Sequence, residues 1–139
     1  MNPPFHNYRL VNPLVSIAAV AAGGALGSVL RFLVSGWFLS RFGPGIPWGT
    51  FAVNISGSFA IGVVLALAAA RSDFSPYLRL LLAPGILGGY TTFSAFAYET
   101  YALGTDGFPI QSIAYAAGSV LAGVVAAYAG VALVRSAHP

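Results

Sequence analysis

Apolar residues fill four long stretches of the chain, and charged residues are almost absent from them. The stretches run roughly over 14–38, 48–70, 77–103 and 110–134. A helix needs about 20 apolar residues to cross about 30 Å of hydrocarbon, and each stretch is long enough. No strand-like alternation runs through them, and a backbone in lipid must satisfy its own hydrogen bonds. The predicted fold is therefore all-α: one membrane domain of four transmembrane helices, residues 1–139, with both termini on one side.

Short connections rich in turn-forming residues separate the stretches. They cover residues 43–47, 71–76 and 104–109, and glycine or proline occurs in each one. None of them is long enough to form a domain of its own. The first stretch is too long for the apolar part of a signal peptide, and three more stretches follow it.

The composition excludes several classes of protein. Hydrophobic residues make up 58% of the chain and charged residues only 6%, whereas a soluble domain has about 25% charged residues. A soluble enzyme and a disordered chain are both excluded. The chain has no cysteine, which excludes disulfides, thiolate metal sites and cysteine nucleophiles. Its net charge is only +3, and the arginines are scattered, so nucleic acid is not a predicted partner.

The positions of the arginines favour one orientation in the membrane. Arg41 lies on the side opposite the termini, and Arg31 lies within about two turns of that end. The other arginines fall on the side of the termini, which the positive-inside rule places in the cytoplasm. They are Arg9, Arg71, Arg79 and Arg135.

Polar residues follow one face of the second stretch. Thr50, Asn54 and Ser58 are spaced four apart, which places them on one side of a helix. Small polar residues often serve only to pack membrane helices together. The amide of Asn54 also has two N–H donors suited to holding an anion. The pattern leaves packing and anion binding both open.

The fourth stretch has a comparable face. Ser112, Tyr115 and Ser119 recur at helical spacing and form a stripe of hydroxyl groups. Glycine and alanine residues beside them favour helix packing. The hydroxyl stripe is compatible with packing and with an ion path.

The middle of the third stretch is predicted to break. Pro84 lacks a backbone N–H, and two glycines followed by Thr91 and Thr92 make a weak helix centre. We expect unpaired carbonyl and N–H groups there, which survive at membrane depth only where they line a cavity or bind an ion. Bare carbonyls suit a hard cation. A kinked packing helix is the alternative.

Side chains beyond the expected break add further chemistry. Phe93 and Phe96 share a face, and their electropositive ring edges can face an anion, although such pairs are usually lipid contacts or core. Arg31 either extends to the interface or gives a vestibule positive potential. Glu99 either acts as a helix cap, joins a hydroxyl network or takes up protons. Gly23 and Gly27 form a GxxxG pair typical of helix packing.

Three segments of the chain resemble the Fluc (CrcB) family of small fluoride channels. They are GALGSVLR at 24–31, GTFAVNISGS at 49–58 and GGYTTFSAF at 88–96, with Glu99 following the third segment. The likeness covers nearly the whole chain. It implies a homodimer of antiparallel subunits with dual topology and two fluoride pores. It also implies a structural Na⁺ at the dimer centre, held by the backbone carbonyls of Gly88 and Thr91.

The resemblance also assigns pore positions. It implies that Asn54, Thr50, Phe93, Phe96, Tyr115 and Ser119 contact fluoride, and Ser58 is a further donor on the same face. Family members often have hydroxyl residues where this chain has Ala95, Ala97 and Gly123.

We expect a channel and not an enzyme, conducting cytoplasmic fluoride passively across the plasma membrane and so reducing its toxicity. A tightly hydrated ion requires strong replacement donors, which these residues offer. One alternative is a proton-coupled exporter like the small multidrug resistance proteins, although these have a glutamate in the first helix and this chain has none there. The other alternative is a membrane assembly protein without transport activity.

Overall fold

The computed structural model describes residues 12–137, and every regular element in that range is a helix. Helices α1 (Pro13–Phe42), α2 (Trp48–Ala70) and α6 (Pro109–Ala137) are continuous. The third crossing consists of α3 (Pro76–Leu80), the π-helical η2 (Leu81–Leu87), α4 (Gly88–Tyr90) and α5 (Phe93–Thr105). Within the described range, four segments are long and apolar enough to cross a membrane: 13–42, 48–70, 76–105 and 109–137. They contain the four stretches expected from the sequence, and the all-α, multi-pass fold is confirmed.

Local sequence explains where α1 begins and ends. The Asn12 side chain accepts a hydrogen bond of 2.9 Å from the backbone N–H of Leu14, and Pro13 occupies the first helical position. Both are favourable at a helix start. At the other end Gly43 has φ of 76° and its N–H bonds the carbonyl of Leu39. Only glycine adopts this conformation without strain, so the chain reverses there.

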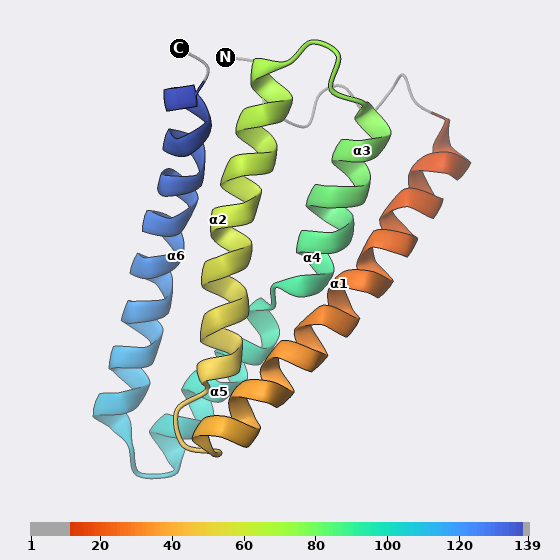
Figure 1. Ribbon diagram of the computed structural model, residues 1–139. Coiled ribbons are helices and arrows are strands. Elements are labelled where there is room, and N and C mark those ends of the chain that lie inside the picture. The colour runs from red at the N-terminus through yellow and green to blue at the C-terminus, as the bar shows by residue number, and fades with distance from the viewer. Residues whose placement is uncertain (1–11, 138–139) are drawn as a thin grey trace.

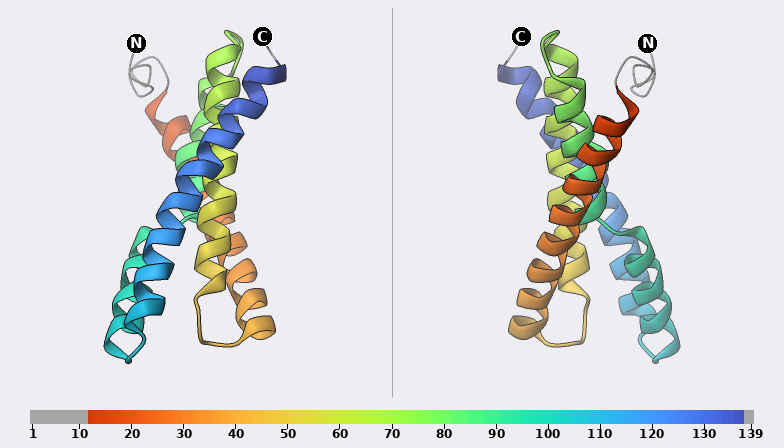
Figure 2. Two further views of the ribbon diagram at one scale, coloured as in Figure 1. Left: turned by 90° about the vertical axis from the view of Figure 1, so that its left-hand side faces the viewer. Right: turned by 90° about the vertical axis from the view of Figure 1, so that its right-hand side faces the viewer.

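Helix α2 lies in the middle of the molecule (Figure 1). It packs most extensively against α6, while α1 packs along η2 and α4. The side views in Figure 2 show that the helices cross and then separate into two arms, α1 with the start of α2 and α5 with the start of α6. Both ends of the described range lie beside the α2–α3 turn (Figure 1). Arg9, which we expected on this side, lies outside the described residues.

Glycines allow α1 to approach the third crossing closely. A Cβ atom added to Gly27 would overlap the carbonyl oxygen of Ile86, and one added to Gly23 would overlap that of Leu81. Any larger side chain would therefore push these backbones apart. The predicted packing role of the Gly23–Gly27 pair is confirmed, and its partner is the third crossing of the same subunit.

The third crossing is broken, as predicted, but over a shorter segment. Helix continues through Gly88–Tyr90, and only Thr91 (φ −83°, ψ 158°) and Thr92 (φ −150°, ψ 120°) are extended. Pro84 does not end the helix, because it lies inside the wider π-helical turns of η2, which accommodate the missing N–H. The two β-branched residues, not the glycines before them, form the break.

Candidate functional site

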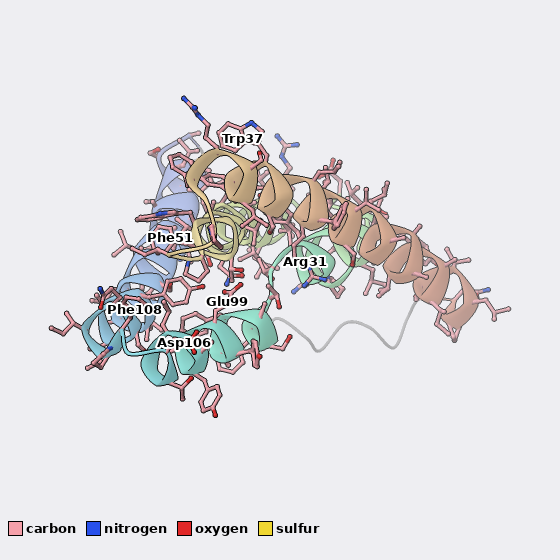
Figure 3. The ribbon with its side chains drawn as sticks, turned by 90° about the horizontal axis from the view of Figure 1, so that it is seen from below. Arg31, Trp37, Phe51, Glu99, Asp106 and Phe108 are labelled. Atoms are coloured by element: carbon pink, nitrogen blue, oxygen red, sulfur yellow. The ribbon has the colours of Figure 1, made fainter. Side chains whose placement is uncertain are left out.

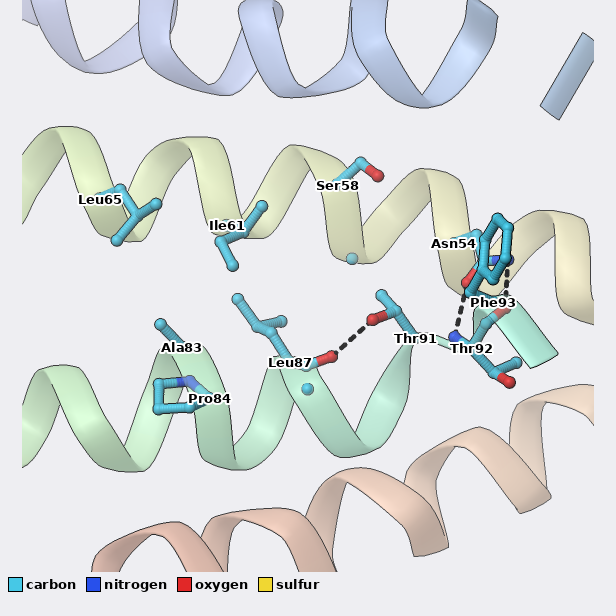
Figure 4. A pocket seen from close by; sticks show the side chains of 12 residues that line it. Asn54, Ser58, Ile61, Leu65, Ala83, Pro84, Leu87, Thr91, Thr92 and Phe93 are labelled. Atoms are coloured by element: carbon cyan, nitrogen blue, oxygen red, sulfur yellow. Dashed lines mark hydrogen bonds between the residues drawn. The ribbon is translucent and has the colours of Figure 1, made fainter. Parts of the chain in front are cut away.

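Asn54 of α2 binds the broken segment through both polar atoms of its side chain. Its Nδ2 donates to the carbonyl oxygen of Thr92 at 3.0 Å, and its Oδ1 accepts from the N–H of Thr92 at 2.8 Å. Figure 4 shows this pair of hydrogen bonds beside Phe93. The N–H and carbonyl of Thr92 were expected to be unpaired, and that expectation is wrong for this residue. A carboxamide satisfies both because it contains one donor group and one acceptor.

Glu99 of α5 joins three helices. Its Oε1 accepts a hydrogen bond of 2.7 Å from Thr50 of α2, and its Oε2 accepts one of 2.8 Å from Tyr115 of α6. Of the two roles we considered beyond capping, the geometry is that of a hydroxyl network. Two O–H donors reduce the cost of placing a carboxylate among apolar helices. Thr50 and Tyr115 therefore direct their donors at Glu99.

The sequence analysis considered a hydroxyl network for Glu99 but did not identify Thr50 and Tyr115 as its members, although a signal for them was present. An acid inside a membrane span requires donors at its own depth. Thr50 and Tyr115 both lie near the start of their helices, and Glu99 lies near the end of its own. All three therefore lie within about two turns of the same membrane surface. A comparison of the depths of polar residues in different spans would have predicted that these three residues meet.

Three aromatic rings lie in a row from α5 to α6. The ring centroids of Phe93 and Phe96 are 5.8 Å apart, and those of Phe96 and Tyr115 are 5.5 Å apart. Phe96 is half-buried, whereas the side chain of Phe93 is 78% exposed within this single chain. A ring with so little cover from its own subunit has its faces and edges available to another molecule.

A pocket of about 330 Å³ lies between α2, α5 and α6. Ser119 is its most buried polar residue, at 8% exposure, and its Oγ has no hydrogen-bond partner among the described residues. A buried hydroxyl without a partner is costly unless something binds it. The pocket is lined by Asn54, Ser58, Phe93, Phe96, Ser119, Val120, Gly123, Val124 and Ala127. Five of the expected pore residues are in this one lining.

Gly123 lies next to Ser58 in this pocket. A Cβ atom added there would lie 3.4 Å from the Ser58 Oγ. A side chain at this position would therefore be in contact with the Ser58 hydroxyl. Ala95 contributes only its backbone, whose N–H bonds the Thr92 Oγ1 at 3.2 Å.

A second pocket, of about 480 Å³, lies on the other side of Asn54 between α2 and the third crossing. Gly88 and Thr91 line it, and Figure 4 shows Thr91 facing α2 from the third crossing. In a continuous helix their carbonyls would accept from the N–H groups of Thr92 and Ala95, but those groups bond Asn54 and the Thr92 side chain instead. The break therefore deprives both carbonyls of their helical donors.

Arg31 is separate from both pockets. It is half-buried on α1, and Figure 3 shows its side chain extending toward the space between the two arms, where Glu99 also lies. A third pocket, of about 270 Å³, opens under the α1–α2 turn and reaches Thr50 and Glu99. Besides Thr50 and Glu99, Ser35 is the polar residue in the lining of this pocket.

Comparison with known proteins identifies the family. Residues 18–131 match the family described as "CrcB-like protein, Camphor Resistance (CrcB)". A protein of Rhizobium meliloti named "Fluoride-specific ion channel FluC" is 48% identical over 120 residues, which cover 86% of this chain and 96% of the relative. Proteins of the same name from Agrobacterium fabrum and Leptospira interrogans are 46% and 42% identical, covering 88% and 87% of this chain and 98% and 95% of the relatives. The chain therefore belongs to the CrcB family.

Proposed function

We propose that this chain forms a fluoride-selective channel in the plasma membrane, through which cytoplasmic fluoride leaves the cell passively. Relatives covering most of the chain are named fluoride-specific channels. The observation that carries the proposal within the chain is the unpartnered Oγ of Ser119, buried in a pocket that Asn54 and Phe96 also line. The protein is a channel and not an enzyme.

This pocket has the chemistry that a dehydrating halide requires. Fluoride gives up its water only where donors replace it, and the number and strength of those donors set selectivity. Ser119 and Ser58 offer hydroxyls, and Asn54 retains one N–H that does not bond Thr92. The positive edges of the Phe93 and Phe96 rings add weak attraction without binding the ion tightly.

The Glu99 network forms the outer part of the proposed path. On α2, Thr50 lies about one helical turn nearer the membrane surface than Asn54. On α6, Tyr115 lies about one turn nearer that surface than Ser119. The hydroxyls of Thr50 and Tyr115 contact fluoride only when they rotate away from Glu99. Arg31 adds positive potential near the entrance and raises the local concentration of anions.

A second copy of the chain completes the pore. Phe93 is 78% exposed, and the rim residues Val120 and Val124 of the pocket are exposed as well. One subunit therefore encloses only part of the path. An antiparallel homodimer with dual topology brings two such surfaces together by symmetry and yields two pores.

The break in the third crossing supports a structural Na⁺ at the dimer centre as part of this proposal. The carbonyls of Gly88 and Thr91 have lost their helical donors and would hold the ion as hard oxygen ligands. When bound, the cation supplies charge that holds the two broken segments together. Replacing Na⁺ by N-methylglucamine should lower the dimer's melting temperature, as measured by fluorescence-detected gel filtration; an unchanged value would argue against the ion.

Fluoride efflux from liposomes tests the proposed function. Purified protein is reconstituted with trapped fluoride or chloride, valinomycin is added to balance charge, and ion-selective electrodes record release. We expect rapid fluoride release, chloride release close to that of protein-free liposomes, and no requirement for a proton gradient. Equal release of both halides, or proton-driven release of organic cations, would contradict the proposal.

A further inference from the structure

The side chain of Asn54 makes more hydrogen bonds within the protein than a residue that only binds an ion would need. Both its oxygen and one of its N–H groups are bonded to the main chain of a single residue, Thr92, at 2.8 and 3.0 Å. Thr92 is extended, and an extended residue can present its N–H and carbonyl to the same partner, as in a sheet. The amide thus takes the place of a neighbouring strand.

The bonded residue directly precedes the aromatic helix. Thr92 is the N-cap of α5, and its Oγ1 accepts from the N–H of Ala95 at 3.2 Å. Phe93 is the first residue of α5 and Phe96 lies one turn further on. Fixing Thr92 therefore fixes the point from which both rings are directed into the pocket.

Helix α2 is a suitable anchor for this contact. It is continuous, and Val53, next to Asn54, has no exposed surface. One turn along, Gly57 admits the side chain of Thr91, since a Cβ atom at Gly57 would overlap the Thr91 Cγ2. The two residues of the break are thus seated on adjacent turns of one rigid helix.

The hydrogen bonds of Thr92 hold the beginning of α5 to α2. Figure 2 shows α5 leaving the central helices together with the start of α6, against which it packs. Among residues 12–137, the other hydrogen bond between this part of the chain and α2 is the one that Thr50 donates to Glu99, near the far end of α5. In lipid, a Thr92 without Asn54 would have an unsatisfied N–H and carbonyl and would seek other partners. The orientation of α5 would change with them.

We propose that Asn54 is a positioning residue, which clamps the main chain of Thr92 and thereby holds the Phe93 and Phe96 rings in the geometry that fluoride passes. This inference rests on the proposed function and deepens it. The clamp acts in the absence of fluoride, whereas a residue that only binds the ion acts in its presence. That difference makes the two roles separable.

The test observes the Phe96 ring without fluoride. 4-Fluorophenylalanine is placed at position 96 by stop-codon suppression, and its ¹⁹F resonance is recorded in fluoride-free buffer. Asn54→Ala and Asn54→Leu should shift or broaden the resonance and lose most of the fluoride flux while gel filtration still shows the assembled protein. Ser58→Ala is the matched control: it removes a polar group from the same two pockets one turn away, and should leave the resonance in place.

Two results would overturn the clamp. One is a resonance that Asn54→Ala and Asn54→Leu leave unchanged in fluoride-free buffer. The other needs no variant: in ¹⁵N-threonine-labelled wild-type protein, the Thr92 amide should resist hydrogen exchange as the helical Thr100 amide does, and immediate exchange would contradict the bond to Asn54. Neither measurement depends on conduction. A wild-type protein that conducts no fluoride would therefore refute the proposed function without bearing on the clamp.

Discussion

At the scale of single residues, the polar groups of the membrane interior fall into two kinds. Asn54, Thr50 and Tyr115 are bonded to other protein groups, whereas the Oγ of Ser119 has no partner among residues 12–137. Bonded groups hold the helices in place, and an unbonded donor has capacity for a ligand. Ser119 is therefore the residue whose loss should affect the ion and leave the fold unchanged.

Ser119→Ala should cut fluoride efflux from liposomes and leave thermal stability unchanged. A hydrogen bond to a charged group is worth about 1.5–3 kcal/mol, which corresponds to about tenfold or more in rate. Ser136→Ala makes the same chemical change near the end of α6, where the hydroxyl only bonds the carbonyl of Leu133, and should conduct as wild type. Wild-type flux in Ser119→Ala would count against its contact with fluoride.

At the scale of elements, glycines decide how closely the third crossing approaches α1. The overlap of a Cβ atom at Gly27 with the Ile86 carbonyl shows that backbone meets backbone there. Gly24, on the same helix, has open space at its own Cβ position. A substitution at Gly27 therefore tests close helix packing, and the same substitution at Gly24 tests the effect of replacing a helical glycine without a clash.

Gly27→Ala should destabilise the protein and Gly24→Ala should not. Overpacking costs about 1–3 kcal/mol, while an alanine without a clash gains up to about 1 kcal/mol in helix propensity. Thermal unfolding followed by gel filtration in detergent measures both. Equal melting temperatures for the two variants would show that the close approach of α1 does not contribute to stability.

Most of the helices were predictable from the sequence, because a backbone in lipid has few alternatives to a helix. Hydropathy and turn residues located the helices, and Thr91 with Thr92 lay within the predicted break. The extent of the break was not predictable, since it depends on Asn54 bonding Thr92 from another helix. A hydroxyl network was one of the roles considered for Glu99, but its partners Thr50 and Tyr115 were not predictable, because spacing along one helix does not reveal partners on another.

At the scale of the whole molecule, a single subunit separates into two arms (Figure 2). Phe93 is 78% exposed in this single chain, and a second subunit would cover it. The proposed dimer is antiparallel, yet arginines gather at the end where α2 and α6 finish. The positive-inside rule by itself predicts one orientation. The antiparallel dimer requires both orientations in one membrane.

Labelling of a single cysteine decides between these orientations. The chain has no cysteine of its own, so Asp73→Cys, in the exposed α2–α3 turn, gives a unique reporter. In inside-out vesicles a membrane-impermeant maleimide should label about half of the protein, as a two-fold antiparallel pair requires. Gly45→Cys, in the exposed α1–α2 turn, should behave identically. Complete labelling of one variant and none of the other would establish a single orientation.

In the proposed channel, fluoride passes beside the aromatic rings of α5. The most direct measurement compares fluoride efflux from liposomes containing wild type, Phe96→Ile and Phe32→Ile, the last on α1 with 75% of its side chain exposed. We predict that Phe96→Ile loses most of its flux while remaining assembled, and that Phe32→Ile conducts as wild type. Wild-type efflux through Phe96→Ile would show that fluoride does not depend on these rings.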